Sequence, residues 1–218
     1  MKRAYCLAIL MLITSTLACS FDLGLPDEES AADNVYFQDD FSDESSGWPR
    51  VRTTNEGMTD YENGAYRILV NLENQDYLGI PELSPQSNVR VEVDVTKVAG
   101  SDDNDFGILC RYQDDSNYYQ FLVSSDGYVG ILKVMDGSWQ NIAAETLLEH
   151  SAVNMGNAQN HIGANCIGDL LTLYVNGQQV STAQDSTFPG SGKVGVFAGT
   201  YDVPGADIYF DNFTVTLP

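Results

Sequence analysis

Hydrophobic residues recur at every second position over much of this chain, and this pattern restricts its fold more than any other feature. Val89, Val91, Val93 and Val95 alternate with polar or charged residues, and residues 106–112 repeat the pattern. A period of two places alternate side chains on one face of a β-strand. No segment has a sustained helical period, so we predict an all-β protein.

Four dipeptides mark tight turns between these alternating runs: Asn63-Gly64, Asp126-Gly127, Asp136-Gly137 and Asn176-Gly177. Asn, Asp and Gly tolerate the positive φ angles that two-residue hairpin turns require. Their spacing predicts about twelve to fourteen short strands, which favours a two-sheet antiparallel jelly-roll sandwich.

The composition excludes a disordered acidic tail and several kinds of partner. The chain is 43% hydrophobic and 11% aromatic, and its 31 acidic and 10 basic residues give a formal net charge of −21. This content of apolar residues can form a core. The negative field repels nucleic acid and anionic lipid headgroups, so we expect neither as a partner.

The N-terminus has the parts of an export signal. Lys2 and Arg3 precede an uncharged apolar run over residues 4–16, and small residues then lead to Cys19. A cysteine at the cleavage site resembles the signal of bacterial lipoproteins, although Thr16 stands where Leu is usual. An ordinary signal peptide or a single membrane span is the alternative, but a span needs about 20 apolar residues.

The signal, the composition and the strand pattern together predict a division of the chain into three parts. Residues 1–18 are expected to be the signal peptide and residues 19–34 an acidic tether. Residues 35–218 are expected to be the β-sandwich domain. Cys19 would be lipidated, so the protein would be exported and anchored to the bacterial cell envelope, touching the membrane only through its lipid.

Two cysteines remain once Cys6 leaves with the signal and Cys19 takes the lipid. Cys110 and Cys166 both lie at apolar-phase positions of expected strands. In an oxidising compartment we predict a disulfide between neighbouring strands, with two buried free thiols as the alternative.

The second half of the chain resembles laminin-G and concanavalin A-like sandwiches. The resemblance is carried by residues 170–180 (LLTLYVNGQQV), by residues 192–197 (GKVGVF) and by residues 208–215 (IYFDNFTV). Within this group the likeness is greatest to the 3-keto-disaccharide hydrolase-like domains, whose opening strand is similar to residues 39–41. The resemblance implies the fold more strongly than any activity, because this superfamily contains enzymes, lectins and inert spacers.

Glu92 and Asp94 resemble part of the catalytic strand of one branch of concanavalin-like glycosidases. Lys97 stands where that strand carries its second Glu. Retaining hydrolysis needs two carboxyl groups about 5 to 5.5 Å apart, so the pair is incomplete. Glu92, Asp94 and His161 are therefore weak catalytic candidates, and a solvated strand face with a structural histidine is the alternative.

Calcium is the one cofactor that the resemblance implies. Related sandwiches often hold a structural calcium where the first and last strands pair, and here that junction carries Asp39, Asp40, Asp211 and Asn212. Calcium prefers several carboxylate and carbonyl oxygens. Two further acidic clusters between expected strands, at residues 102–105 and 114–117, are also candidates for calcium, with plain turn chemistry as the alternative.

A carbohydrate-binding face is expected on the sheet that contains Arg111. Alternation places Arg111 on the face opposite Cys110, and one of the tyrosines at 118 and 119 must face outward. We predict ligand contacts from Arg111, Tyr118, Gln120 and Trp139, since aromatic residues stack on sugar rings while Arg and Gln bind hydroxyls. The leading expectation is glycan recognition without catalysis. A glycoside-cleaving enzyme and a structural or adhesion spacer, whose protein partner is unknown, are the alternatives.

Overall fold

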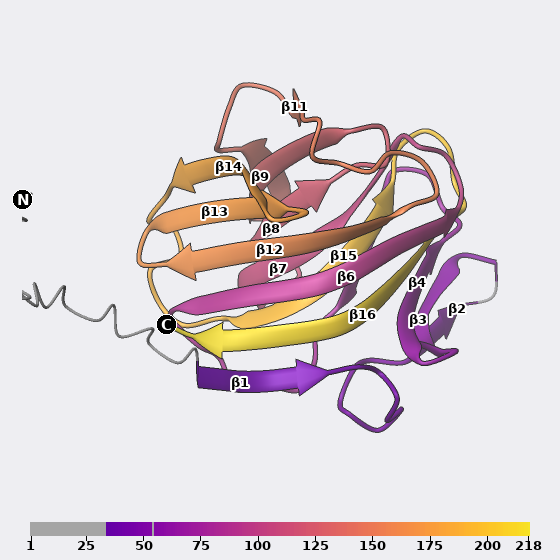
Figure 1. Ribbon diagram of the computed structural model, residues 1–218, viewed down its shortest axis with the longest axis horizontal. Helices are drawn as coiled ribbons and strands as arrows, with labels where there is room; N and C mark the ends of the chain where they lie inside the picture. The colour runs from indigo at the N-terminus through magenta and orange to yellow at the C-terminus, as the bar shows by residue number, and fades with distance from the viewer. Residues whose placement is uncertain (1–33, 54) are drawn as a thin grey trace, which may run out of the picture. The chain divides into compact units, whose positions relative to one another are not determined.

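The computed structural model describes residues 34–53 and 55–218, and this part of the chain forms two antiparallel β-sheets packed face to face (Figure 1). The described ranges contain strands, turns and bends but no helix, so the predicted all-β jelly-roll sandwich is confirmed. Accordingly, no helix able to cross a membrane is found among these residues. The expected signal peptide at 1–18, the lipidation site Cys19 and the tether up to residue 33 lie outside them.

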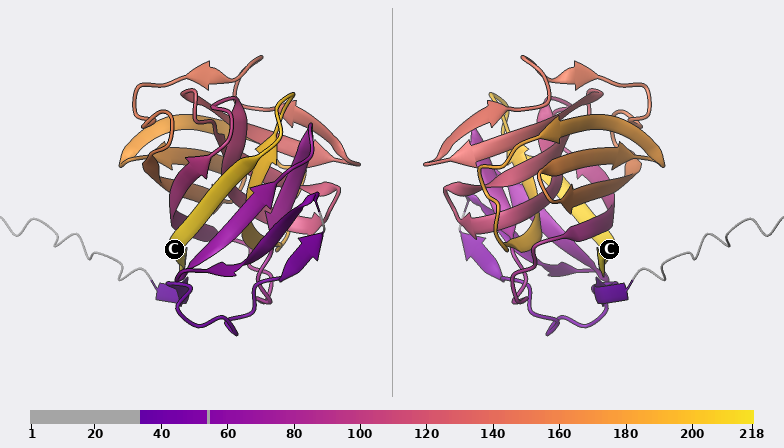
Figure 2. Two further views of the ribbon diagram at one scale, coloured as in Figure 1. Left: turned by 90° about the vertical axis from the view of Figure 1, so that its right-hand side faces the viewer. Right: turned by 90° about the vertical axis from the view of Figure 1, so that its left-hand side faces the viewer.

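The nine-stranded sheet contains both ends of the described chain. β1 (Asn34–Asp39) pairs with one half of β16 (Ala206–Leu217), and β4 (Ala65–Val70) pairs with the other half (Figure 1). Figure 2 shows β16, in yellow, beside the purple strands β4 and β3 (Gly57–Glu62). In sheet order the strands are β14 (Gln178–Gln184), β13 (Leu170–Val175), β12 (Gln159–Ile167), β6 (Val89–Ala99), β16 (Ala206–Leu217), β4 (Ala65–Val70), β3 (Gly57–Glu62) and β2 (Val51–Thr53), with β1 (Asn34–Asp39) on β16.

The seven-stranded sheet covers the other side of the core. Its order is β10 (Ser138–Asn141), β9 (Tyr128–Met135), β8 (Asn117–Val123), β7 (Asn104–Asp114), β15 (Lys193–Thr200) and β5 (Gln75–Gly79), with β11 (Leu148–Glu149) on β9. β15 comes late in the sequence but inserts between β7 and β5. This crossover brings together segments that lie far apart along the chain.

The period-two pattern determines which side chains enter the core. Val89, Val91, Val93 and Val95 are fully buried, whereas the residues between them on β6 are exposed or half-buried. Burial of each such side chain stabilises the fold by about 1.5–3 kcal/mol. All four turn dipeptides connect antiparallel neighbours, and Asn176 and Gly177 both have positive φ, as the hairpin between β13 and β14 requires.

A disulfide joins Cys110 to Cys166, so that part of the prediction is confirmed. Its expected position is corrected. Cys110 lies on β7 and Cys166 on β12, which belong to different sheets. Both side chains point into the core from facing sheets, so the bond connects the two layers rather than neighbouring strands.

Candidate functional site

A groove crosses the outer face of the seven-stranded sheet and consists of two adjoining cavities. The larger, of about 570 Å³, lies over β7, β8, β9 and β10, and the smaller, of about 460 Å³, reaches the β5 edge. Gln75 and Asp76 line both cavities, so β5 is where they meet. The larger cavity is lined by Asn74, Gln75, Asp76, Asp105, Gln120, Leu132, Trp139, Asn141, Glu145, Thr146, Leu147, Thr200 and Tyr201.

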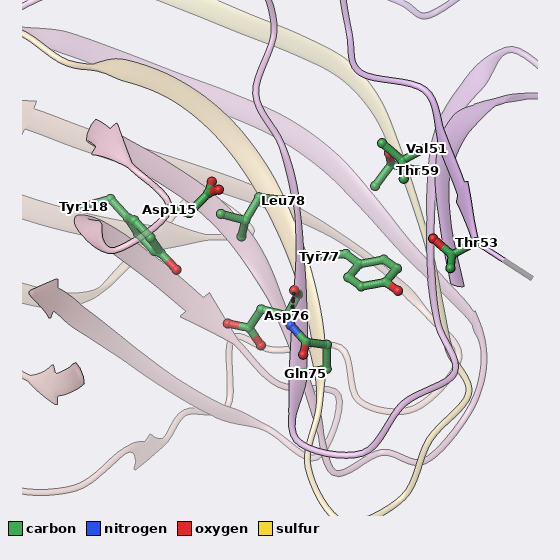
Figure 3. Close-up of a pocket in the computed structure, with 9 residues that line it drawn as sticks. All are labelled: Val51, Thr53, Thr59, Gln75, Asp76, Tyr77, Leu78, Asp115 and Tyr118. Atoms are coloured by element: carbon green, nitrogen blue, oxygen red, sulfur yellow. Dashed lines mark hydrogen bonds between the residues drawn. The ribbon is translucent and has the colours of Figure 1, made fainter. Parts of the chain in front are cut away.

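The smaller cavity lies at the open edge of the sandwich (Figure 3). The side chains of Asp76 and Leu78 lie on the Tyr118 side of β5, whereas Tyr77 is turned toward Thr53 on β2. The cavity therefore extends from the outer face of one sheet to the edge strand of the other.

An apolar layer forms the floor of the groove. Leu109, Leu122 and Phe197 are fully buried there although they face away from the main core, and they pack with Tyr118, Leu132 and Val134 as a second cluster. The segment between β10 and β11 covers part of this layer. A Cβ on Gly130 would lie 2.4 Å from Leu147 Cδ2, so the glycine makes room for that cover.

Two aspartates meet in the middle of the groove. Gly199 on β15 is the register partner of Asp76 on β5 and of Asp105 on β7. Because Gly199 has no side chain, both carboxylates approach the space above it. A Cβ built on Gly199 would lie 2.1 Å from Asp105 Oδ1 and 2.2 Å from Asp76 Oδ1. These two oxygens are therefore no farther apart than the sum of those distances.

The environment of this acid pair disfavours ionisation of both groups. Burial raises the pKa of the Asp105 carboxyl well above its ordinary value, and the charge of Asp76 raises it further. A hydrogen bond from Tyr201 lowers this pKa, but by less than burial raises it. Burial also raises the pKa of Asp76, whereas the hydrogen bond from Gln120 lowers it. Two like charges at this separation need a compensating positive charge or a proton.

Trp139 forms one wall of the larger cavity. It lies on the edge strand β10 and is 71% exposed, the highest value among the large hydrophobic side chains of the described residues. The other tryptophan, Trp48, is buried in the main core. An exposed aromatic ring beside a cavity can stack on the apolar face of a ligand.

Three of the four expected ligand residues line the groove. Tyr118 borders the smaller cavity, and Gln120 and Trp139 border the larger. Gln120 Nε2 donates a hydrogen bond of 2.8 Å to Asp76 Oδ2. As alternation requires, the neighbouring Tyr119 faces the core.

The expected position of Arg111 is corrected by the structure. Its φ is 52° and the pairing register shifts next to it, so the alternation fails there and the side chain leaves the groove face. The guanidinium is buried and donates to three backbone carbonyls, those of Phe188 and Gly190 at 2.8 Å and that of Gly168 at 3.1 Å. Arg111 therefore holds loops together.

The weak catalytic candidates lie on the outer face of the nine-stranded sheet, on the side of the sandwich away from the groove. Asp94 Oδ1 and His161 Nδ1 share a hydrogen bond of 2.8 Å, and Asn212 Nδ2 donates to the other oxygen of Asp94 at 3.0 Å. Glu92 is exposed on the same strand. Lys97 is buried and pairs with Asp102, so it does not replace the missing Glu.

The residues of the expected calcium junction have separate partners. β1 and β16 do pair, with Asp39 opposite Phe213. Asp39 accepts hydrogen bonds from Trp48 Nε1 and the Phe41 amide, while Asp40 accepts from Ser42. Asp211 accepts from the amide of Asn212. Calcium binding at this junction stays a prediction, and the hydrogen bonds at Asp39 stabilise the fold without a metal.

The sequence did not predict that Asp76 and Asp105 meet, because the two residues lie far apart in the sequence and share no motif. Asp105 closes the acidic cluster at 102–105, for which turn chemistry was the alternative to calcium binding, and Asp76 belongs to no motif. The only signal was a glycine inside an apolar strand, at residue 199, which often marks a close approach.

Comparisons with known proteins identify the class of fold. No protein-family model matches the chain, and no curated protein matches it. Solved structures do match, and among them are a carbohydrate-binding module, a β-glucanase and a protein with a galectin-like fold. All of those compared below are less than 25% identical to this chain, so the likeness establishes the fold alone.

Three structures illustrate this likeness. The carbohydrate-binding module CBM66 from Bacillus subtilis has a TM-score of 0.63 at 20% identity, covering 79% of this chain and 96% of that one. A Bacillus licheniformis β-glucanase has a TM-score of 0.59 at 12% identity, covering 86% and 100%. A GH43 protein from Bacillus licheniformis has a TM-score of 0.62 at 16% identity, covering 83% of this chain but only 39% of that protein.

Proposed function

We propose that this protein binds a carbohydrate chain in the groove without cleaving it. The observation that carries the proposal is Trp139, an exposed indole beside the polar side chains of Gln120 and Asn141 in one cavity. The apolar face of a sugar ring can stack on the indole. The amide and carboxylate groups can then exchange hydrogen bonds with its hydroxyls.

The charge of the groove favours neutral or amino sugars. Asp76, Asp105, Asp115 and Glu145 are among the lining residues, whereas no Lys, Arg or His of the described chain lines either cavity. An acidic groove repels uronic acids and sulfated sugars. The two cavities adjoin, which supports a chain of several sugar units rather than a single monosaccharide.

The geometry of the acid pair argues against hydrolysis. Glycosidases place their two carboxyl groups about 5–5.5 Å apart for retention, or about 6.5–9.5 Å for inversion. The Oδ1 atoms of Asp76 and Asp105 instead converge on one small volume above Gly199 and do not flank a space for a glycosidic bond. The enzyme alternative, including cleavage of 3-keto disaccharides, is kept as an outcome of the test.

Export and a lipid anchor at Cys19 complete the proposal. They are supported by the signal-like N-terminus, with its basic start, apolar run and cleavage-site cysteine. Tethered at the cell envelope, the groove would meet glycans of the wall or of the surroundings.

The test is binding of the purified protein to immobilised neutral, amino and acidic glycans, with 3-keto disaccharides added and scored for turnover. We expect binding to neutral or amino glycans and no turnover. Trp139→Ala should weaken binding by about fivefold or more, because an aromatic contact of this kind contributes about 1 kcal/mol or more. Tyr128→Ala is the control, since Tyr128 is an exposed aromatic residue that lines neither cavity.

Each other result would change the interpretation. Turnover would establish the enzyme. Equal weakening by both variants would mean that Trp139 has no specific role. Absence of both binding and turnover with every glycan would favour a tethered structural or adhesion spacer.

A further inference from the structure

We propose that Asp76 and Asp105 form a binding site for a divalent cation, with calcium as the expected ion, in the space above Gly199. This site is separate from the junction of β1 and β16 where the sequence predicted calcium. It does not depend on whether the groove also binds carbohydrate.

The first observation is the convergence of two carboxylates on one point. Asp76, Gly199 and Asp105 form a single row across β5, β15 and β7. With any side chain at position 199, the two Oδ1 atoms could not occupy their places, since both lie within 2.2 Å of where a Cβ would be. The glycine therefore permits a pair of oxygens to face the same small volume.

The second observation is an unpartnered oxygen. Asp105 is only 6% exposed, and its Oδ1 is buried without a hydrogen-bond partner among the described residues. Oδ1 of Asp76 faces the same volume, while Oδ2 of Asp76 accepts from Gln120. A buried carboxylate is normally paired or bound to a metal. No donor of the described chain is placed on Asp105 Oδ1.

A hard divalent cation fits these oxygens in charge and chemistry. It compensates both negative charges, whereas a shared proton compensates one. Calcium takes six to eight oxygen ligands, including neutral amide, hydroxyl and water oxygens. Gln120, Thr200 and Tyr201 line the same cavity and carry such oxygens.

The strength of binding follows from the number of acids. In the described part of the chain no three His, Cys, Asp or Glu side chains are grouped so as to hold a metal. Two carboxylates, with neutral oxygens and water completing the shell, correspond to a site of modest affinity. We expect a Kd of about 10⁻⁴–10⁻³ M, as in extracellular calcium modules.

The experiment titrates the purified full-length chain with terbium, whose luminescence is sensitised by nearby aromatic residues, and then displaces it with calcium. Tyr201 and Trp139 line the same cavity as the two aspartates, so sensitisation is expected. The wild-type protein should give a saturable signal that calcium removes, and calcium should raise its melting temperature.

Variants locate the site. Asp105→Asn and Asp76→Asn keep the shape of the side chain and remove its charge, and each should weaken calcium binding at least tenfold. Asp94→Asn is the matched control: Asp94 is hydrogen-bonded to His161 on the other sheet, and its replacement should leave calcium affinity unchanged. Asp211→Asn tests the β1–β16 junction in the same assay.

Gly199→Ala provides a variant that keeps both carboxylates. The added methyl group would force them apart, so calcium binding should fall as in the charge variants. If this protein fails to fold, the two Asn variants still decide the question.

The possible results separate cleanly. Absence of a calcium-displaceable signal in the wild-type protein would overturn the proposal and indicate a shared proton. Equal calcium affinity in Asp105→Asn and wild type would also overturn the proposal. Loss of calcium binding in Asp211→Asn alone would overturn it as well, and would indicate that the calcium site lies at the junction of β1 and β16. Calcium binding without glycan binding would leave the cation site standing while the proposed function fails.

Discussion

Asp185 connects the loop before β15 to the seven-stranded sheet through several hydrogen bonds. Lys133 Nζ lies 2.7 Å from Asp185 Oδ2, and the Tyr119 hydroxyl donates to Oδ1 at 2.6 Å. Burial by itself would raise the pKa of Asp185, but hydrogen bonds from Lys133, Thr187 and Tyr119 outweigh it and hold this pKa well below its ordinary value. The ionised carboxylate therefore stabilises the folded state.

Asp185→Asn should lower the free energy of unfolding by about 2–3 kcal/mol at pH 7, because hydrogen bonds to a charged group are lost. A carboxyl whose pKa is depressed by folding contributes its full stabilisation above its unfolded pKa of about 3.9. That contribution is lost as the pH falls through the lower folded pKa. Urea unfolding of wild type and variant at pH 7 and pH 3 should show the difference shrinking at the lower pH.

The control for this experiment is Asp202→Asn, at an exposed acid in the loop between β15 and β16. Its effect on stability should stay within about 0.5 kcal/mol. A difference between wild type and Asp185→Asn that is the same at both pH values would show that the charge of Asp185 does not contribute.

At the scale of elements, Arg111 shows how an irregular strand position organises the loops around it. The positive φ at Arg111 turns its guanidinium toward the connection between β14 and β15 and the turn between β12 and β13. Gly192 is required beside it, because a Cβ there would lie 2.5 Å from the Arg111 backbone. The bulge and the glycine together close this end of the sandwich.

Arg111→Ala should therefore act on stability and not on glycan binding. Three carbonyls would lose their charged donor, and we expect a loss of about 2–4 kcal/mol in the free energy of unfolding. Thermal denaturation and glycan affinity should be measured on the same preparation. A folded Arg111→Ala variant of normal stability that no longer binds glycan would instead show that Arg111 contributes to glycan binding.

At the scale of the whole molecule, the disulfide between Cys110 and Cys166 ties the two sheets together across a separation of 56 residues in the sequence. Closing a loop of this size reduces the entropy of the unfolded chain by an amount equivalent to about 4 kcal/mol. The Cys110→Ser/Cys166→Ser double variant should therefore melt well below the wild-type protein. Scanning calorimetry of the oxidised, reduced and double-variant proteins would check this, and identical melting temperatures would contradict it.

Much of the architecture could be predicted from the sequence because it rests on local patterns. The valines of β6 show the core-facing positions directly, and Asn176-Gly177 shows the hairpin between β13 and β14. On the expectation that Cys6 is removed with the signal and that Cys19 is lipidated, Cys166 was the partner left for Cys110, which predicted the disulfide. Tyr118 and Gln120 could be placed on one face by alternation alone.

The centre of the groove was decided only by tertiary structure. Asp76 and Asp105 meet because β15, far along the chain, inserts between β5 and β7 with a glycine in the shared row. The Arg111 side chain lies outside the groove because the positive φ of Arg111 itself interrupts the alternation of its strand. Alternation and turn chemistry act between residues close in sequence. Strand register, and the space left by a missing side chain, depend on which distant strands become neighbours.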